Sequence, residues 1–220
     1  MRAAFARWPA PPAGRASSLV RKTAPRPATS QYCWLRRHNG PVQRVSVVGN
    51  SGSGKTTLGA ALGAAIGVPH LELDSVFHQP NWEPLDRDEF RRRVGEYVAA
   101  DRWVVDGNYS AVRDLVWGRA DTVVWLDLPR SRVIRQLLWR TIRRGALRTT
   151  LWNGNRERLT NLFRADPQES IVAWAWTRHH VYRERYLAAS RDPANAHLNF
   201  VRVRSPRERT ALLRRAREQP

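Results

Sequence analysis

A glycine-rich run carries residue types that bind phosphate. It reads Gly49-Asn50-Ser51-Gly52-Ser53-Gly54-Lys55-Thr56-Thr57, and its first eight residues satisfy the pattern G-x-x-x-x-G-K-[ST]. Glycines let successive backbone N–H groups point at phosphate oxygens. In this pattern Lys55 can reach the β- and γ-phosphates of a nucleoside triphosphate, and the Thr56 hydroxyl can ligand Mg²⁺. The run therefore predicts a binding site for ATP and Mg²⁺.

Three aspartates could complete such a site. Asp106 ends the apolar run Trp103-Val104-Val105, and a carboxylate in that place often holds the water shell of Mg²⁺ in phosphate-loop folds. Asp127, which follows another apolar run, is a rival for the same role. Asp74 could orient or deprotonate an acceptor hydroxyl, or it could cap the turn that begins at Ser75.

Arginine dominates residues 130–164, which contain ten arginines and one acid, Glu157. Guanidinium groups suit phosphate oxygens and the charge that develops during phosphoryl transfer. We single out Arg140, Arg144 and Arg156 as candidate catalytic residues, because they flank residues 147–155. The alternative is that these arginines only fill a solvated helix face in a chain that uses arginine for 36 of its 38 basic residues.

The elements that must position these residues follow an alternating pattern. Apolar runs predict strands at 45–48, 70–73, 103–105, 122–126 and 198–203. Helical spacing predicts helices at 58–66, 90–98, 131–144, 156–163, 169–189 and 206–217. Such alternation is typical of a doubly wound α/β sheet, in which ligands gather at the carboxyl ends of the strands. The arginine-rich helical section, at about 130–190, is longer than an ordinary crossover and is predicted to be an inserted lid.

Composition divides the chain into two parts. Residues 1–41 are rich in Pro, Ala and Arg without apolar periodicity, so we expect a disordered basic tail before a phosphate-loop domain at 42–220. The tail is either a solvated extension or an arm that contacts nucleic acid, and the net charge of +19 fits both. We expect a cytoplasmic protein without a membrane contact, because no apolar run approaches a membrane span or a signal peptide. The single cysteine, Cys33, excludes an intrachain disulfide.

The motifs together resemble the adenylate-kinase-like branch of P-loop proteins, and within it the DNA topology modulation proteins. The resemblance rests on the phosphate-binding run, on Leu73-Asp74 with Pro80-Asn81-Trp82, and on Val105-Asp106-Gly107-Asn108-Tyr109. It implies a five-stranded parallel sheet like that of nucleoside-monophosphate kinases, an ATP-type nucleotide and a lid that closes over it with arginines. It also favours Asp106 as the Mg²⁺ acid. Adenylate kinases continue with Phe-Pro-Arg where this chain has Asn108-Tyr109-Ser110, so AMP is not implied as the acceptor.

Two functions are consistent with these observations. The first is a small kinase that transfers the γ-phosphoryl group of ATP to a nucleotide or a small polar acceptor, and the motif order, the predicted lid and Asp74 favour it. The second, which the basic tail and the net charge favour, is an ATP-binding protein associated with nucleic acid. An ATPase without a small acceptor is a further alternative. The sequence leaves the acceptor and the oligomeric state open.

Overall fold

Five parallel strands form the centre of the computed structural model, which describes residues 42–146, 150–155 and 171–218. The strands are ordered β2-β3-β1-β4-β5 in the sheet. Their bounds are β1 Arg44–Gly49, β2 His70–Glu72, β3 Trp103–Asp106, β4 Thr122–Leu126 and β5 Asn199–Val203. This order, with every pair parallel, confirms the predicted five-stranded sheet.

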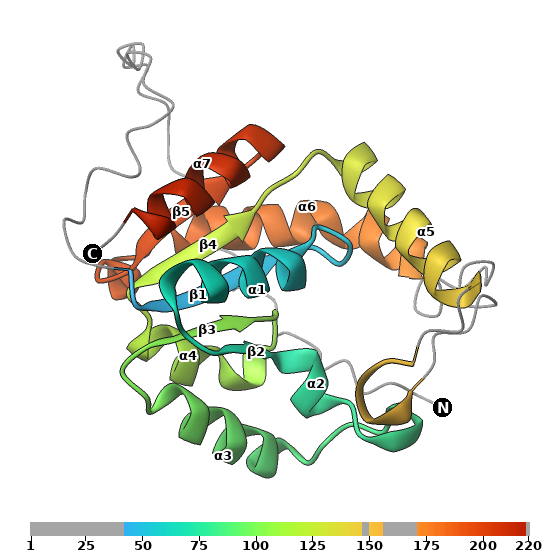
Figure 1. Ribbon diagram of the computed structural model, residues 1–220, viewed down its shortest axis with the longest axis horizontal. Helices are drawn as coiled ribbons and strands as arrows, with labels where there is room; N and C mark the ends of the chain where they lie inside the picture. Colours follow the sequence, from blue (N-terminus) through green and yellow to red (C-terminus); the bar gives the residue numbers. More distant parts are fainter. Residues whose placement is uncertain (1–41, 147–149, 156–170, 219–220) are drawn as a thin grey trace, which may run out of the picture.

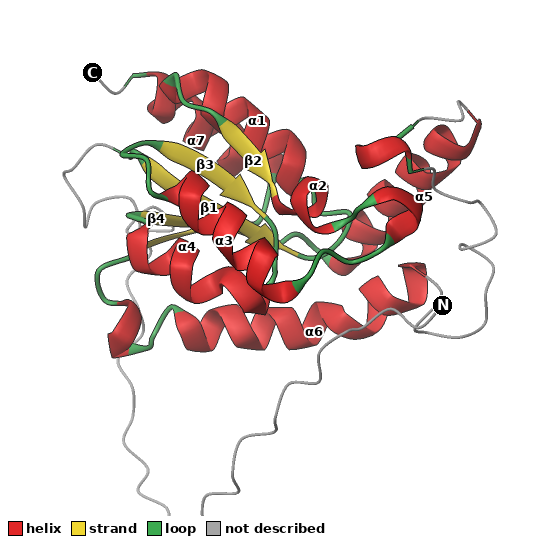
Figure 2. Cartoon of the chain, turned by 90° about the horizontal axis from the view of Figure 1, so that it is seen from below, coloured by secondary structure: helices red, strands yellow, loops and turns green. Residues whose placement is uncertain are grey.

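Helices cover both faces of the sheet, as Figures 1 and 2 show. The α-helices are α1 Lys55–Ile66, α2 Leu73–Phe77, α3 Arg87–Val98, α4 Arg113–Arg119, α5 Arg130–Ala146, α6 Ile171–Ala189 and α7 Pro206–Arg217. Short 3₁₀ turns are η2 Pro80–Trp82, η3 Ser110–Val112, η4 Trp152–Gly154 and η6 Pro193–Asn195. Helices α1 and α7 lie on one face, and α3, α4 and α6 lie on the other (Figure 2). Within the described ranges, no helix has the length and hydropathy needed to cross a bilayer.

The apolar strands are buried because both faces of a doubly wound sheet are covered. In β1, Val45 and Val47 pack with α1 and α7, whereas Val48 packs with α3 and α4. The same alternation divides β4, where Val124 packs on the side of α1 and α7 and Trp125 packs on the side of α3 and α4. Continuous apolar runs therefore fill two cores.

The observed elements differ from the predicted ones in two places. Strand β2 ends at Glu72, so Asp74 lies in the first turn of α2 instead of ending the strand. Helix α4 was not predicted, because seven residues are too few to establish a helical period. The predicted tail at 1–41 and the predicted helix at 156–163 lie outside the described residues.

Helices α5 and α6 belong to the section predicted as a lid, and parts of them pack against the phosphate-binding loop and the core. The side chains of Val133 and Leu137 on α5 are buried, and a Cβ added to Gly52 would lie 2.8 Å from the Cβ of Leu137. The first half of α5 thus packs directly against the loop. At the far end of α6, Tyr186 is 1% exposed and belongs to the core beside α4. The second half of α6 is therefore part of the core layer.

Candidate active site

The nine residues of the predicted phosphate site span the end of β1, the loop that follows it and the first turn of α1. Gly52 and Gly54 have φ angles of 78° and 88°, a region that side chains with a Cβ rarely adopt. The Ser53 N–H donates to the Asn50 carbonyl (3.1 Å) and closes a turn. Among the described residues, no side chain caps the first turn of α1 at Gly54. The first N–H groups of α1 therefore face the loop, where they could bind an anion.

Lys55 lies among charged side chains from α2, β3 and α5. Its Nζ donates to the Asn50 carbonyl (3.2 Å). Burial lowers the pKa of Lys55, Asp74 and Asp106 partly oppose this effect, and Arg140 adds to it. The ammonium group is thus close to both predicted site aspartates and to one predicted lid arginine.

Thr56 lies between two carboxylates at the ends of neighbouring strands. Its hydroxyl donates to Glu72 Oε1 (2.8 Å) and lies 3.4 Å from Asp106 Oδ1. The register pairs Glu72 of β2 with Asp106 of β3, which explains why the two acids are adjacent. Burial is the main cause that raises the pKa of Glu72, and the nearby Asp106 and Asp74 also raise it. Sequence reasoning missed Glu72, although its position two residues before Asp74 was a usable signal.

A hydroxyl and two carboxylates form a set of hard oxygen donors, which suits Mg²⁺. In the part of the chain that the structure describes, no group of three or more His, Cys, Asp or Glu side chains is arranged to hold a metal by itself. Mg²⁺ usually keeps waters and binds through one or two carboxylates together with substrate phosphates. Thr56, Asp106 and Glu72 therefore fit an ion that arrives with a nucleotide.

The two rival acids at the strand ends have different partners. Asp106 is 2% exposed and lies 2.8 Å from His70 Nε2, facing Thr56. Asp127, after β4, accepts from Arg202 Nε (2.8 Å) and lies 3.7 Å from Arg183 Nε. Asp127 thus belongs to an ion-pair cluster with β5 and α6. The geometry favours Asp106 as the acid beside the phosphate loop.

Asp74 is held by a tyrosine instead of capping a turn. The Tyr109 hydroxyl donates to Asp74 Oδ1 (2.7 Å), and it also lies 3.4 Å from His78 Nε2. Burial and the Asp74 charge raise the pKa of Tyr109, so this hydroxyl keeps its proton. The arrangement leaves Asp74 as an oriented carboxylate near Lys55.

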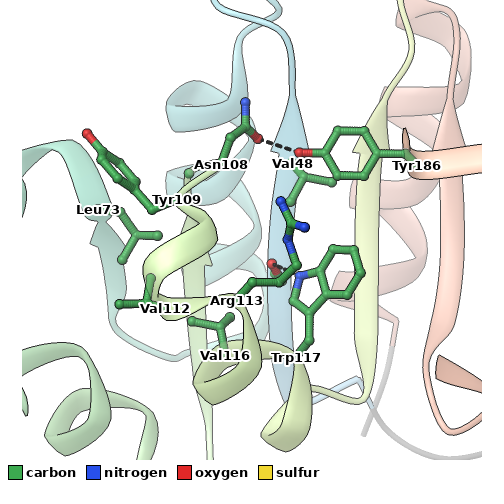
Figure 3. A pocket seen from close by; sticks show the side chains of 11 residues that line it. Val48, Leu73, Asn108, Tyr109, Val112, Arg113, Val116, Trp117 and Tyr186 are labelled. Atoms are coloured by element: carbon green, nitrogen blue, oxygen red, sulfur yellow. Dashed lines mark hydrogen bonds between the residues drawn. The ribbon is translucent and has the colours of Figure 1, made fainter. Parts of the chain in front are cut away.

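Asn108 fixes the start of the phosphate loop. Its Nδ2 donates to the Gly49 carbonyl (2.5 Å), and its Oδ1 accepts from the Gly49 N–H (3.2 Å) and from the Tyr186 hydroxyl (2.8 Å). Figure 3 shows this last bond across a cavity that Arg113 and Trp117 also line. The Arg113 guanidinium lies 5.4 Å from the Trp117 ring centre, and burial lowers its pKa. Asn108 thus links the loop to α6.

Residues 150–155 dock on the segment that follows β2, beside α2 in Figure 1. Trp152 Nε1 donates to Glu72 Oε2 (2.9 Å). Asn155, 4% exposed, accepts from the Trp82 N–H and donates to the Gln79 carbonyl, both at 2.9 Å. The Trp152 ring stacks on His78 with 6.2 Å between centres. The link to Glu72 joins this segment to the side of the site where Thr56 lies.

The structure locates only two of the three arginines predicted to act in the lid. Arg140 influences the pKa of Lys55, which places it near the phosphate loop. Arg144 lies in the last turn of α5, and its catalytic role stays a prediction. Arg156 lies outside the described residues.

No family model and no curated protein matches the chain. Similar proteins are found among solved structures. A gluconokinase from Sinorhizobium meliloti 1021 is 23% identical, with a TM-score of 0.42, over 80% of this chain and 94% of that one. A shikimate kinase from Bacteroides thetaiotaomicron is 14% identical, with a TM-score of 0.49, over 80% and 97%. A shikimate kinase from Acinetobacter baumannii in complex with shikimate is 20% identical, with a TM-score of 0.44, over 79% and 90%. The fold assignment rests on the strand order and phosphate loop of this chain itself.

Proposed function

We propose that the protein is a small-molecule kinase that transfers the γ-phosphoryl group of ATP to a hydroxyl of a small polar acceptor. The observation that carries this proposal is the convergence on Lys55 of groups suited to the two substrates. Asp106, next to Thr56, belongs to the nucleotide side, whereas Asp74, held by Tyr109, has no evident role in nucleotide binding. A protein that only bound ATP would not need an oriented carboxylate there.

Each residue has a role in this reaction. The loop at Gly49–Thr57 would cradle the phosphates, and Lys55 would balance charge on the transferred group. Thr56, Asp106 and Glu72 would hold Mg²⁺, which when bound neutralises charge on the phosphate oxygens. Asp74 would orient the acceptor hydroxyl and accept its proton as the new O–P bond forms. The bond between the γ-phosphorus and the β–γ bridging oxygen would break in the same transfer, and ADP would leave.

Closure of the site is the expected task of the lid. Arg140 approaches the phosphate loop, where it could stabilise charge that develops during transfer. Arg144 and Arg156 are proposed to act with it when ATP is bound. Docking of residues 150–155 over the acceptor side would exclude water, which favours transfer to the acceptor over hydrolysis.

Labelled ATP provides the test. The protein would be incubated with γ-labelled ATP, Mg²⁺ and pooled small metabolites, and the label followed by chromatography. We expect label in an organic phosphate, and Asp74→Asn should lower this transfer by about 10²-fold or more, as loss of a general base does. Asn can still accept the Tyr109 hydrogen bond, so the local geometry is retained. Asp101→Asn, which changes an exposed acid, is the matched control. Label found only in inorganic phosphate would overturn transfer to a small molecule.

The remaining predictions from sequence are not part of this proposal. Nucleic-acid contact was one of the two alternatives given for residues 1–41, which lie outside the described residues. The finer resemblance to DNA topology modulation proteins rests on the motifs alone and gives no reaction.

A further inference from the structure

His70 occupies a partly buried place beside the acid that the proposed reaction assigns to Mg²⁺. Its side chain is 15% exposed, and its Nε2 lies 2.8 Å from Oδ2 of Asp106, which is 2% exposed. An ionised carboxylate can only accept hydrogen bonds, so Nε2 is the donor. A donor at this distance makes a strong bond, because the acceptor is charged.

The two oxygens of Asp106 have different neighbours. Oδ2 accepts from His70, whereas Oδ1 lies 3.4 Å from the Thr56 hydroxyl. A carboxylate held through one oxygen has little freedom about its terminal torsion. His70 therefore directs the other oxygen of Asp106 toward Thr56.

Helix α1 leaves room for the imidazole through a glycine. A Cβ added to Gly59 would lie 2.4 Å from His70 Nε2 and 2.9 Å from its Cδ2, which is too close for any side chain. Glycine in a helix interior destabilises the helix relative to alanine, so its presence here has a cost. The space that Gly59 leaves is filled by the histidine ring.

Strand geometry places the ring on the site side. His70 and Glu72 are two residues apart in β2, so their side chains share one face, and Glu72 accepts from Thr56 on that face. His70 pairs in register with Val104 and Glu72 with Asp106. The histidine thus reaches Asp106 from one side while Glu72 flanks it on the other.

We propose that His70 is a positioning residue that fixes Asp106 for Mg²⁺, and that Gly59 admits it. This inference rests on the proposed role of Asp106 with Mg²⁺-bound ATP. His70 acts through the orientation of the carboxylate and does not touch the ion or the nucleotide. Its removal should therefore weaken the effect of Mg²⁺ on nucleotide binding more than nucleotide binding itself.

Binding of a fluorescent ATP analogue, measured with EDTA and with saturating Mg²⁺, separates these effects. For His70→Leu we expect the ratio of the two affinities to fall by about 10-fold, a typical loss when a partner of a metal ligand is removed. The affinity for the analogue in EDTA should change by less than about 3-fold, because His70 acts only through the carboxylate that would hold the metal. His70→Gln carries an amide donor near the position of Nε2 and should restore most of the ratio. The affinity of the protein–ATP complex for Mn²⁺, measured by electron paramagnetic resonance, should likewise fall in His70→Leu and recover in His70→Gln.

A second pair of variants changes the same contact without removing the histidine. Gly59→Ala should displace the ring and reproduce the loss seen with His70→Leu. Gly118→Ala is the matched control, because it also adds a methyl group to a helix, at a site where the added Cβ meets no described atom within 4 Å. Gly118→Ala should leave the ratio unchanged.

Three results would overturn the inference. They are an unchanged Mg²⁺ ratio in His70→Leu, an equal loss of binding with and without Mg²⁺, and a His70→Gln variant as defective as His70→Leu. A wild-type protein that binds no ATP under either condition would instead refute the proposed function.

Discussion

Asn155→Ala tests whether residues 150–155 are held over the acceptor side by hydrogen bonds from one buried side chain. Asn155 accepts from the Trp82 N–H and donates to the Gln79 carbonyl, each at 2.9 Å. Its backbone angles, φ −67° and ψ 148°, are accessible to alanine, so the substitution adds no strain. The change therefore removes two interactions and little else.

The expected magnitude follows from these two bonds. Each contributes about 1 kcal/mol net, and the Trp82 and Gln79 groups left without Asn155 add part of their desolvation. The sum is about 2–3 kcal/mol, which shifts the equilibrium between the docked and undocked states of residues 150–155 by about 30- to 150-fold toward the undocked state. Because docking involves one local segment, the core should be unaffected.

Hydrogen exchange at single amides is the suitable assay. The Trp82 amide should exchange about 30- to 150-fold faster in Asn155→Ala, since Asn155 is its acceptor. The Val104 amide, which donates to Pro69 in the core, should not change. Asn195→Ala removes one hydrogen bond, from Asn195 to the carbonyl of Ala189 at the end of α6, and serves as the control.

Either of two results would refute this reasoning. Unchanged exchange at Trp82 would mean that other contacts hold the segment. Equal acceleration at Trp82 and Val104 would mean that Asn155 supports the whole fold and not this segment.

Three further predictions concern the phosphate loop and its neighbours. Lys55→Ala should lower turnover by about 10²–10³-fold, as loss of a transition-state donor does, without lowering the melting temperature, because burial already lowers the pKa of Lys55. The pKa of Glu72 is raised in the folded protein, so its charged form is unfavourable there. The folded protein therefore loses stability as pH rises from the ordinary carboxyl pKa through the pKa of Glu72 in the fold. Without nucleotide, the melting temperature of Glu72→Gln minus that of the wild type should therefore increase between about pH 4 and pH 7. A difference that stays constant over this range would contradict the prediction. Gly54→Ala should destabilise by about 1–2 kcal/mol from backbone strain alone, because a Cβ there meets no described atom within 4 Å. Gly52→Ala should exceed that value in urea unfolding, since its Cβ would also approach Leu137 to 2.8 Å.

Much of the fold could be predicted because parallel strands have a local signature. Runs such as 122–126 are apolar throughout, since both faces of the sheet are covered, and Gly52 and Gly54 match a motif with a defined backbone shape. Short elements lack such a signature. Helix α4 has two turns, and β2 has three residues, so the position of Asp74 after that strand was misjudged.

The sequence by itself predicted the phosphate-binding loop and the two candidate acids Asp106 and Asp127, because each is defined by residues adjacent in the chain. Only the tertiary structure decided which distant side chains surround them. Strand β3 inserts between β1 and β2, and this order sets Glu72 and His70 beside Asp106. Asn155 reaches Trp82 across 73 positions of sequence. Such contacts depend on strand order, register and the path of the connections, which residue types and spacing along the chain do not specify.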